Sequence, residues 1–435
     1  MTRPQLLRLG LFQMAAGGLS VLFLGVLNRV MCVELGIDLL VVGMLVGGGH
    51  YLGALVAIPF GHFSDKHRIG GYRRTLYILL GVTLTGLILA LSPWVARWLS
   101  PAAPPLHVAV AFLFFLLEGM ATFMAGTAYL ALIADHTTPT ERGPATGLVW
   151  TLMMMGIIIT GVGAAMFMRT YAFERMVTLF AGGFAVALLL AVVALWRQEP
   201  SSHAQLCQRS ESLRAALTLL ARSQHSRRFA VFLMVGMFSY FMQDVILEPF
   251  GGEVFGLPPA ETTRFNTYMG VGVGVVAGML LGGMRLIPRM GKRWVAGLGC
   301  WIMVAAFGGL AASGFSQSAR MLAAIITLLG LGAGFFTVGS VALMMDMTSS
   351  QHTGLFVGAW TLVQALAKGP ALITSGGLQS AFLAAGALPG QAYGAIFALE
   401  AAGLLLAILM LHRVGVRRFQ HEVGSFWAFA AENLD

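Results

Sequence analysis

The apolar residues of this 435-residue chain fall into twelve long runs separated by short polar segments. A helix needs about 20 largely apolar residues to cross the hydrocarbon core of a bilayer. Each run is long enough to do so, and the chain is therefore predicted to be an all-α membrane protein with twelve transmembrane helices. The predicted spans are 9–33, 38–62, 74–97, 107–134, 145–168, 174–196, 228–250, 265–287, 294–314, 321–346, 353–376 and 391–412.

The spans divide into two sets of six around a central polar stretch. "GMATFMAGTAYLALIAD" ends at Asp135, and the similar "GLGAGFFTVGSVALMMD" ends at Asp346, 211 positions later. Spans four and five therefore correspond to spans ten and eleven, which is typical of a parallel repeat of two halves. The predicted domains are an N-terminal six-helix half (1–197), a central cytoplasmic loop (198–226), a C-terminal six-helix half (227–412) and a cytoplasmic tail (413–435).

Composition agrees with this class of protein. The chain is 57% hydrophobic and only 10% charged, with a mean hydropathy of +0.81, whereas soluble domains average roughly 25% charged residues. The net charge of +9 comes from Lys and Arg that concentrate in alternate loops. This asymmetry predicts that both termini are cytoplasmic, and it argues against nucleic acid as a partner.

Catalytic motifs are not found. The sequence has no G-x-S-x-G, P-loop, H-E-x-x-H or nucleotide fingerprint, so we do not expect an enzyme. Its three cysteines, Cys32, Cys207 and Cys300, are far apart and have no metal-ligand spacing. No metal site is expected from them.

The loop after the second span reads "GHFSDKHRIGGYRR" and resembles the signature loop of the major facilitator superfamily. An acid in this loop is suited to pairing with arginines and to capping a neighbouring helix, which would latch the cytoplasmic side of the bundle. An ordinary basic loop is the alternative interpretation. The candidate latch residues are Gly61, Asp65, Lys66, Gly71, Arg73 and Arg74.

Charged residues inside the spans are the main candidates for function. Each costs about 2.5–3.5 kcal/mol near the bilayer centre, and such residues usually face the interior of a bundle. The predicted buried polar site comprises Asn28, Arg29, Glu118, Gln243, Asp244, Glu248 and Lys368, and Glu400 is a further intramembrane acid. Two interpretations stay open: an ion pair that locks the outer ends of the two halves, or a site for a ligand or a proton.

Asp244 and Glu248 are spaced i, i+4 and therefore share a helix face. Pro249 follows, so we expect the helix to kink or end there and free backbone carbonyls. Glu253 is then expected in an exposed outer loop. Arg29 and Asn28 are the expected partners of Glu248.

Three motifs give a sharper resemblance. "LNRVMCVELGI" (27–37), "QDVILEPFGGEVFGL" (243–257) and "GLFVGAWTLVQALAKG" (354–369) are similar to the PucC/LhaA family, a bacteriochlorophyll-delivery branch of the major facilitator superfamily. The resemblance implies an assembly factor for bacterial light-harvesting antennae that binds or delivers (bacterio)chlorophyll. It also implies antenna polypeptides or the reaction-centre core complex as partners, and the inner (intracytoplasmic photosynthetic) membrane as location.

Two other functions remain compatible with the residues. Asp244, Glu248 and Lys368 would suit a proton relay in a transporter of a small solute. The chain would also suit a scaffold for photosynthetic complexes that carries no pigment of its own. The fold cannot decide between these functions, because function depends on the site.

His50 is the candidate pigment ligand, because it is the histidine that lies well inside a span. The magnesium of a chlorophyll accepts one axial ligand, usually a neutral histidine nitrogen. The three preceding glycines are expected to leave room for a flat macrocycle. The alternatives are a core histidine bonded to a backbone carbonyl, or pigment ligation by Asp244, Glu248 or Glu118.

Overall fold

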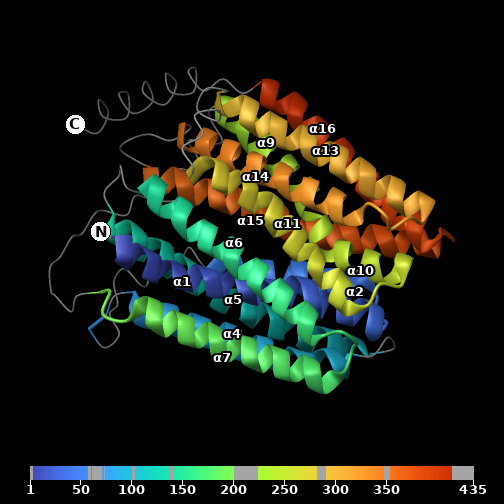
Figure 1. The fold of residues 1–435 in the computed structure, drawn as a ribbon, viewed down its shortest axis with the longest axis horizontal. Helices are drawn as coiled ribbons and strands as arrows, with labels where there is room; N and C mark the ends of the chain where they lie inside the picture. The colour runs from blue at the N-terminus through green and yellow to red at the C-terminus, as the bar shows by residue number, and fades with distance from the viewer. Residues whose placement is uncertain are drawn as a thin grey trace.

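The computed structural model shows a bundle of long helices that run side by side (Figure 1). It describes residues 3–56, 60, 71–72, 74–99, 103–137, 142–199, 224–281, 291–346 and 353–413. Ten stretches within these residues are long and apolar enough to cross a membrane. Together with α11 and α15, they make the described part of the chain a bundle of twelve spanning units, and the prediction of twelve transmembrane helices is confirmed.

The first six spanning units follow the predicted runs closely. The first two are each built from several helical pieces, and the other four are single helices. The elements are α1 (Arg3–Ser20), η1 (Val21–Leu27) and η2 (Val30–Glu34); α2 (Leu39–Gly43), η3 (Met44–His50) and η4 (Gly53–Val56); α4 (Thr75–Trp98); α5 (Pro105–His136); α6 (Arg142–Phe167); and α7 (Phe173–Leu195).

The last six spanning units repeat this plan. The seventh unit is divided into two helices at Met242, and the remaining units are single helices. The elements are α9 (Gln224–Phe241) and α10 (Gln243–Phe255); α11 (Pro259–Leu281); α13 (Lys292–Ser316); α14 (Leu322–Asp346); α15 (Thr353–Ala384); and α16 (Pro389–His412).

The two sets of six units meet along two matching seams. The second unit (α2 and η3) packs against α15, the eleventh, and α6, the fifth, packs against α11, the eighth. In the internal repeat, the second unit is equivalent to the eighth and the fifth to the eleventh. The contact between units two and eleven is therefore equivalent to the contact between units eight and five. The packing is therefore what a parallel repeat predicts.

Unusual helix geometry is concentrated in the first two spanning units. The segments η1, η2 and η3 are π-helical, with a wider turn than the α-helix. Such segments are rare and frequently occur at functional sites. Asn28 and Arg29 lie between η1 and η2, and His50 ends η3, so these three candidate residues lie beside π-helical segments, whereas Glu118 lies in the α-helix α5.

Candidate functional site

The intramembrane polar residues form two groups. We call Asn28, Arg29, Glu34, Glu248 and Asn266 the outer cluster. It lies beside α10, toward the end of the bundle opposite the start of α1 (Figure 1). We call His50, Tyr51, Glu118, Asp244 and Lys368 the central cluster, which lies nearer the middle of the spans.

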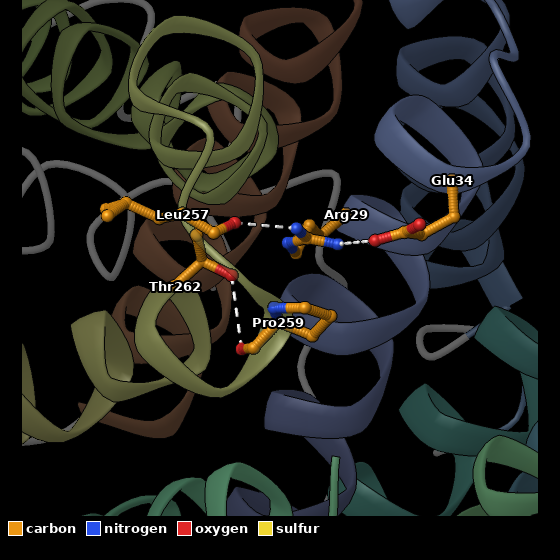
Figure 2. Close-up of polar contacts among 5 residues, drawn as sticks. All are labelled: Arg29, Glu34, Leu257, Pro259 and Thr262. Atoms are coloured by element: carbon orange, nitrogen blue, oxygen red, sulfur yellow. Dashed lines mark hydrogen bonds and ion pairs between the residues drawn. The ribbon is translucent and has the colours of Figure 1, made fainter. Parts of the chain in front are cut away.

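Arg29 connects the first spanning unit to the second half of the chain. Its Nη1 lies 2.6 Å from Glu34 Oε1, and its Nη2 donates to the carbonyl oxygen of Leu257 at 2.9 Å. Figure 2 shows the guanidinium between these two acceptors, next to the first turn of α11, where Thr262 donates to Pro259 O. The side chain of Arg29 is only 3% exposed, whereas that of Glu34 is 25% exposed, so the guanidinium is buried and its carboxylate partner lies at the edge of the buried region.

Asn28 makes a second connection, and Pro249 explains why it is needed. A proline has no N–H, so the carbonyl four residues earlier loses its helical donor. That carbonyl belongs to Val245, and Asn28 Nδ2 donates to it at 2.8 Å. The amide of Asn28 therefore supplies the hydrogen bond that Pro249 removes, across the interface between the two halves.

Pro249 consequently does not end the helix, so of the two predicted outcomes, a kink or an end, the end at this residue is wrong. The helix α10 continues to Phe255, and the break lies earlier, at Met242. Glu253 therefore lies in α10 rather than in a loop. It is exposed, as expected, and its Oε2 accepts from the hydroxyl of Tyr393 at 2.9 Å.

Glu248 is buried, with 4% of its surface exposed. Its Oε1 accepts a hydrogen bond from Asn266 Nδ2 on α11, and its Oε2 has no hydrogen-bond partner among the described residues. The two residues expected as its partners bind elsewhere: Asn28 donates to Val245 O, and Arg29 contacts Glu34 Oε1 and Leu257 O.

The central cluster joins His50 to Glu118. His50 Nδ1 contacts Glu118 Oε2, and Thr122 donates to Glu118 Oε1 at 2.8 Å. The side chain of His50 is 10% exposed and that of Glu118 is 4% exposed, so the protein covers both almost completely. No hydrogen bond to His50 Nε2 is formed within the described part of the chain. His50 is thus a buried histidine, as the alternative interpretation expected, but its partner is a carboxylate rather than a backbone carbonyl.

The glycines before His50 serve a different purpose from the one predicted. A Cβ on Gly47 would lie 2.7 Å from Gly369 O on α15, and one on Gly49 would lie 3.1 Å from Phe112 O on α5. These glycines allow close helix packing, as small residues do in membrane proteins. The expectation that they leave room for a macrocycle is wrong for this conformation.

Lys368 pairs with Asp244, within the second half. Lys368 Nζ lies 2.8 Å from Asp244 Oδ2, and Gln243 Nε2 donates to Asp244 Oδ1. The ammonium also lies 4.1 Å from the ring centre of Phe241 and 5.2 Å from that of Tyr51. Asp244 and Glu248, although one turn apart, thus have different partners and belong to different clusters.

Tyr51 links the two pairs of the central cluster. Its ring meets that of His50 edge-on, with 4.6 Å between the ring centres. The same ring contacts Lys368, whose Nζ lies 5.2 Å from the ring centre. The sequence analysis did not single out Tyr51, Asn266 or Thr122, because nothing in their local sequence distinguishes them. Among the described residues, no group of three His, Cys, Asp or Glu is placed to hold a metal ion.

The predicted cytoplasmic latch falls largely outside the described residues, which do not include Gly61, Asp65, Lys66 or Arg73. Gly71 has a φ of +83°, a left-handed conformation that favours glycine. The backbone N–H groups of Arg74 and Thr75 donate to Glu199 Oε2 at 3.1 and 3.0 Å. Glu199 therefore caps the start of α4, and this role was not anticipated.

Comparison with known proteins agrees with the resemblance found in the sequence. The profile of the family described as "PUCC protein" matches residues 26–419. The "Uncharacterized protein in puhA-bchM intergenic region" of Rhodobacter capsulatus is 33% identical, over 94% of this chain and 88% of that protein. The "Bacteriochlorophyll synthase 44.5 kDa chain" of the same species is 31% identical, over 93% of this chain and 94% of that protein.

Solved structures support the architecture. A bacterial homologue of the lysosomal transporter Spinster, in an inward-facing and unoccupied conformation, superposes with a TM-score of 0.67 at 15% identity, over 97% of this chain and 98% of that one. At this identity the likeness concerns the fold alone. The major facilitator fold predicted from the sequence is confirmed, and the chain is a multi-pass membrane protein.

Proposed function

The chain belongs to the PUCC protein family, and from this membership we propose that it is an assembly factor that binds bacteriochlorophyll and delivers it to light-harvesting antenna polypeptides. A relative of similar length carries the name of a bacteriochlorophyll synthase chain. The proposal includes antenna polypeptides or the reaction-centre core complex as partners. It also includes the bacterial inner photosynthetic membrane as location, with both termini in the cytoplasm.

His50 is the proposed axial ligand of the pigment magnesium. The observation that carries this assignment is that its two ring nitrogens have different surroundings. Glu118 contacts Nδ1, while Nε2 has no partner among the described residues. A carboxylate on one imidazole nitrogen fixes the tautomer and orientation of a histidine whose other nitrogen binds a metal.

The surroundings of His50 are aromatic and apolar. The rings of Phe23 and Phe123 lie 5.0 and 5.5 Å from the imidazole, between ring centres. The same segment, η3, borders an apolar groove of about 630 Å³ between η3, α5 and α15, lined in part by Gly48, Phe112 and Ile373. Ligand sites are commonly of this size and character. Gly47 packs closely against α15 and Gly49 against α5. A macrocycle can therefore enter only if η3 moves away from these two helices.

The test is an absorption spectrum of the protein purified in mild detergent from a bacteriochlorophyll-producing host. We expect a stoichiometric far-red band for the wild type, loss of that band in His50→Phe, and an unchanged band in His107→Phe. His107 is a suitable control because it stacks on Trp98 at the start of α5, away from both clusters. Equal bands in the two variants would rule out His50 as the ligand.

A proton-coupled transporter is the second candidate, and the Asp244–Lys368 pair favours it. The pair lies inside the spans, and its Asp244 and Lys368 side chains are 14% and 17% exposed, so the protein does not cover them completely. Solute uptake by a colourless preparation in liposomes, abolished in Asp244→Asn, would establish this function. A colourless preparation that co-purifies with antenna polypeptides would instead indicate a scaffold.

A further inference from the structure

Glu400 is a buried acid that neither cluster contains. It lies near the middle of α16 and has 0% of its surface exposed. Both of its carboxyl oxygens lack a hydrogen-bond partner within the described part of the chain. Glu400 is thus an intramembrane carboxyl group with no hydrogen-bond donor from those residues to stabilise a negative charge.

The surroundings of Glu400 are apolar and tightly packed. Phe397 and Leu404, one turn away on either side, are fully buried. Phe397 packs against Phe250 of α10 at 5.0 Å and Phe307 of α13 at 6.3 Å, between ring centres. An ionised carboxylate in such a place would lose its hydration without gaining a partner, which is unfavourable in free energy. A buried acid therefore commonly keeps its proton.

The helices that pack against α16 provide few charges near this level. They are α9, α10, α13 and α15. The ionisable residues on the described parts of these helices are His225, Arg227, Arg228, Tyr240, Asp244, Glu248, Glu253, Lys292, Arg293, Cys300 and Lys368. Of these, the positively charged ones other than Lys368 lie at the helix ends where α9 and α13 begin.

We propose that Glu400 is a proton-binding site: its carboxyl group carries a proton in this conformation, because it is fully buried and receives no hydrogen bond from the described residues. This site is independent of pigment binding at His50.

Infrared spectroscopy of the protein reconstituted in lipid tests the proposal directly. A protonated carboxylic acid has a C=O stretching band that a carboxylate lacks. The difference spectrum of wild type minus Glu400→Gln at neutral pH is expected to contain this band. The matched control is Glu174→Gln, an exposed acid in the first turn of α7, and its difference spectrum is expected to contain carboxylate bands only.

A stability measurement makes the test decisive. Glutamine has the shape of a protonated glutamate, so Glu400→Gln is expected to keep the wild-type thermal stability. A marked loss of stability, or a carboxylate band in its difference spectrum, would overturn the proposal.

Discussion

The outer and central clusters use similar residues but connect the two halves of the chain in different ways. In the outer cluster, side chains of the first half donate directly to backbone carbonyls of the second, from Asn28 to Val245 and from Arg29 to Leu257. In the central cluster the ion pairs stay within one half, as His50–Glu118 and Asp244–Lys368. The halves meet there through the ring of Tyr51 beneath Lys368.

This difference suggests a division of roles. Bonds to backbone carbonyls fix the position of a helix, and breaking them leaves a buried polar group unsatisfied. The outer cluster is therefore suited to holding one end of the bundle closed. An ion pair inside one half survives when the halves move apart, so the central cluster is suited to a binding site that opens and closes.

The largest effect is expected at Arg29. Arg29→Leu removes the bond to Leu257 O and leaves Glu34 unpaired. Because Glu34 is 25% exposed, the expected loss in free energy of unfolding lies at the lower end of the about 3–5 kcal/mol for breaking a fully buried pair. Titration with a denaturing detergent measures this loss. The control is Arg175→Leu, an exposed residue at the start of α7, with an expected change within about 0.5 kcal/mol. Equal losses in the two variants would show that Arg29 does not hold the halves together.

Asn28 should have an intermediate effect that depends on Pro249. Asn28→Leu leaves Val245 O without a donor, and an unsatisfied buried carbonyl costs about 1–3 kcal/mol. Adding Pro249→Ala returns an N–H four residues after Val245, so the double variant Asn28→Leu/Pro249→Ala should regain most of the lost stability. The same unfolding measurement decides the matter: if Pro249→Ala brings no recovery, the amide of Asn28 does not replace the missing helical bond.

Asn28 and Pro249 illustrate what can and what cannot be predicted from the sequence. The twelve spans were predictable because the bilayer imposes a length and a polarity on every crossing helix. Arg29, Asp244 and Lys368 stood out because charges are rare in such helices. The effect of Pro249 was not predictable, since the local rule says that the helix should stop, and its continuation depends on Asn28, 221 positions earlier in the chain.

The hydrogen-bond partners of the candidate residues were harder to predict than the residues themselves, because these partners also lie far away in the sequence. Glu248 was identified as buried, but its hydrogen-bond donor is Asn266 on the next helix, and nothing in the local sequence of that asparagine at the start of the predicted eighth span points to Glu248. The pairing of His50 with Glu118 joins two spans whose register against each other is set by Gly49 and Gly53, where a Cβ would collide with α5. Such contacts arise from packing, which no single stretch of sequence records.

The smallest expected effect is at Tyr51, and it tests the contact between the halves in the central cluster. Tyr51→Leu removes the ring beneath Lys368, and a cation–π contact of this kind contributes about 0.5–1 kcal/mol. Tyr51→Phe keeps the ring and removes only the hydroxyl, so it should cost less than Tyr51→Leu. In a Lys368→Met background Tyr51→Leu should cost less than in the wild type, by the energy of the contact. An identical cost in both backgrounds would mean that the ring of Tyr51 stabilises its own half only, and the halves would then be joined at the outer cluster and the helix seams.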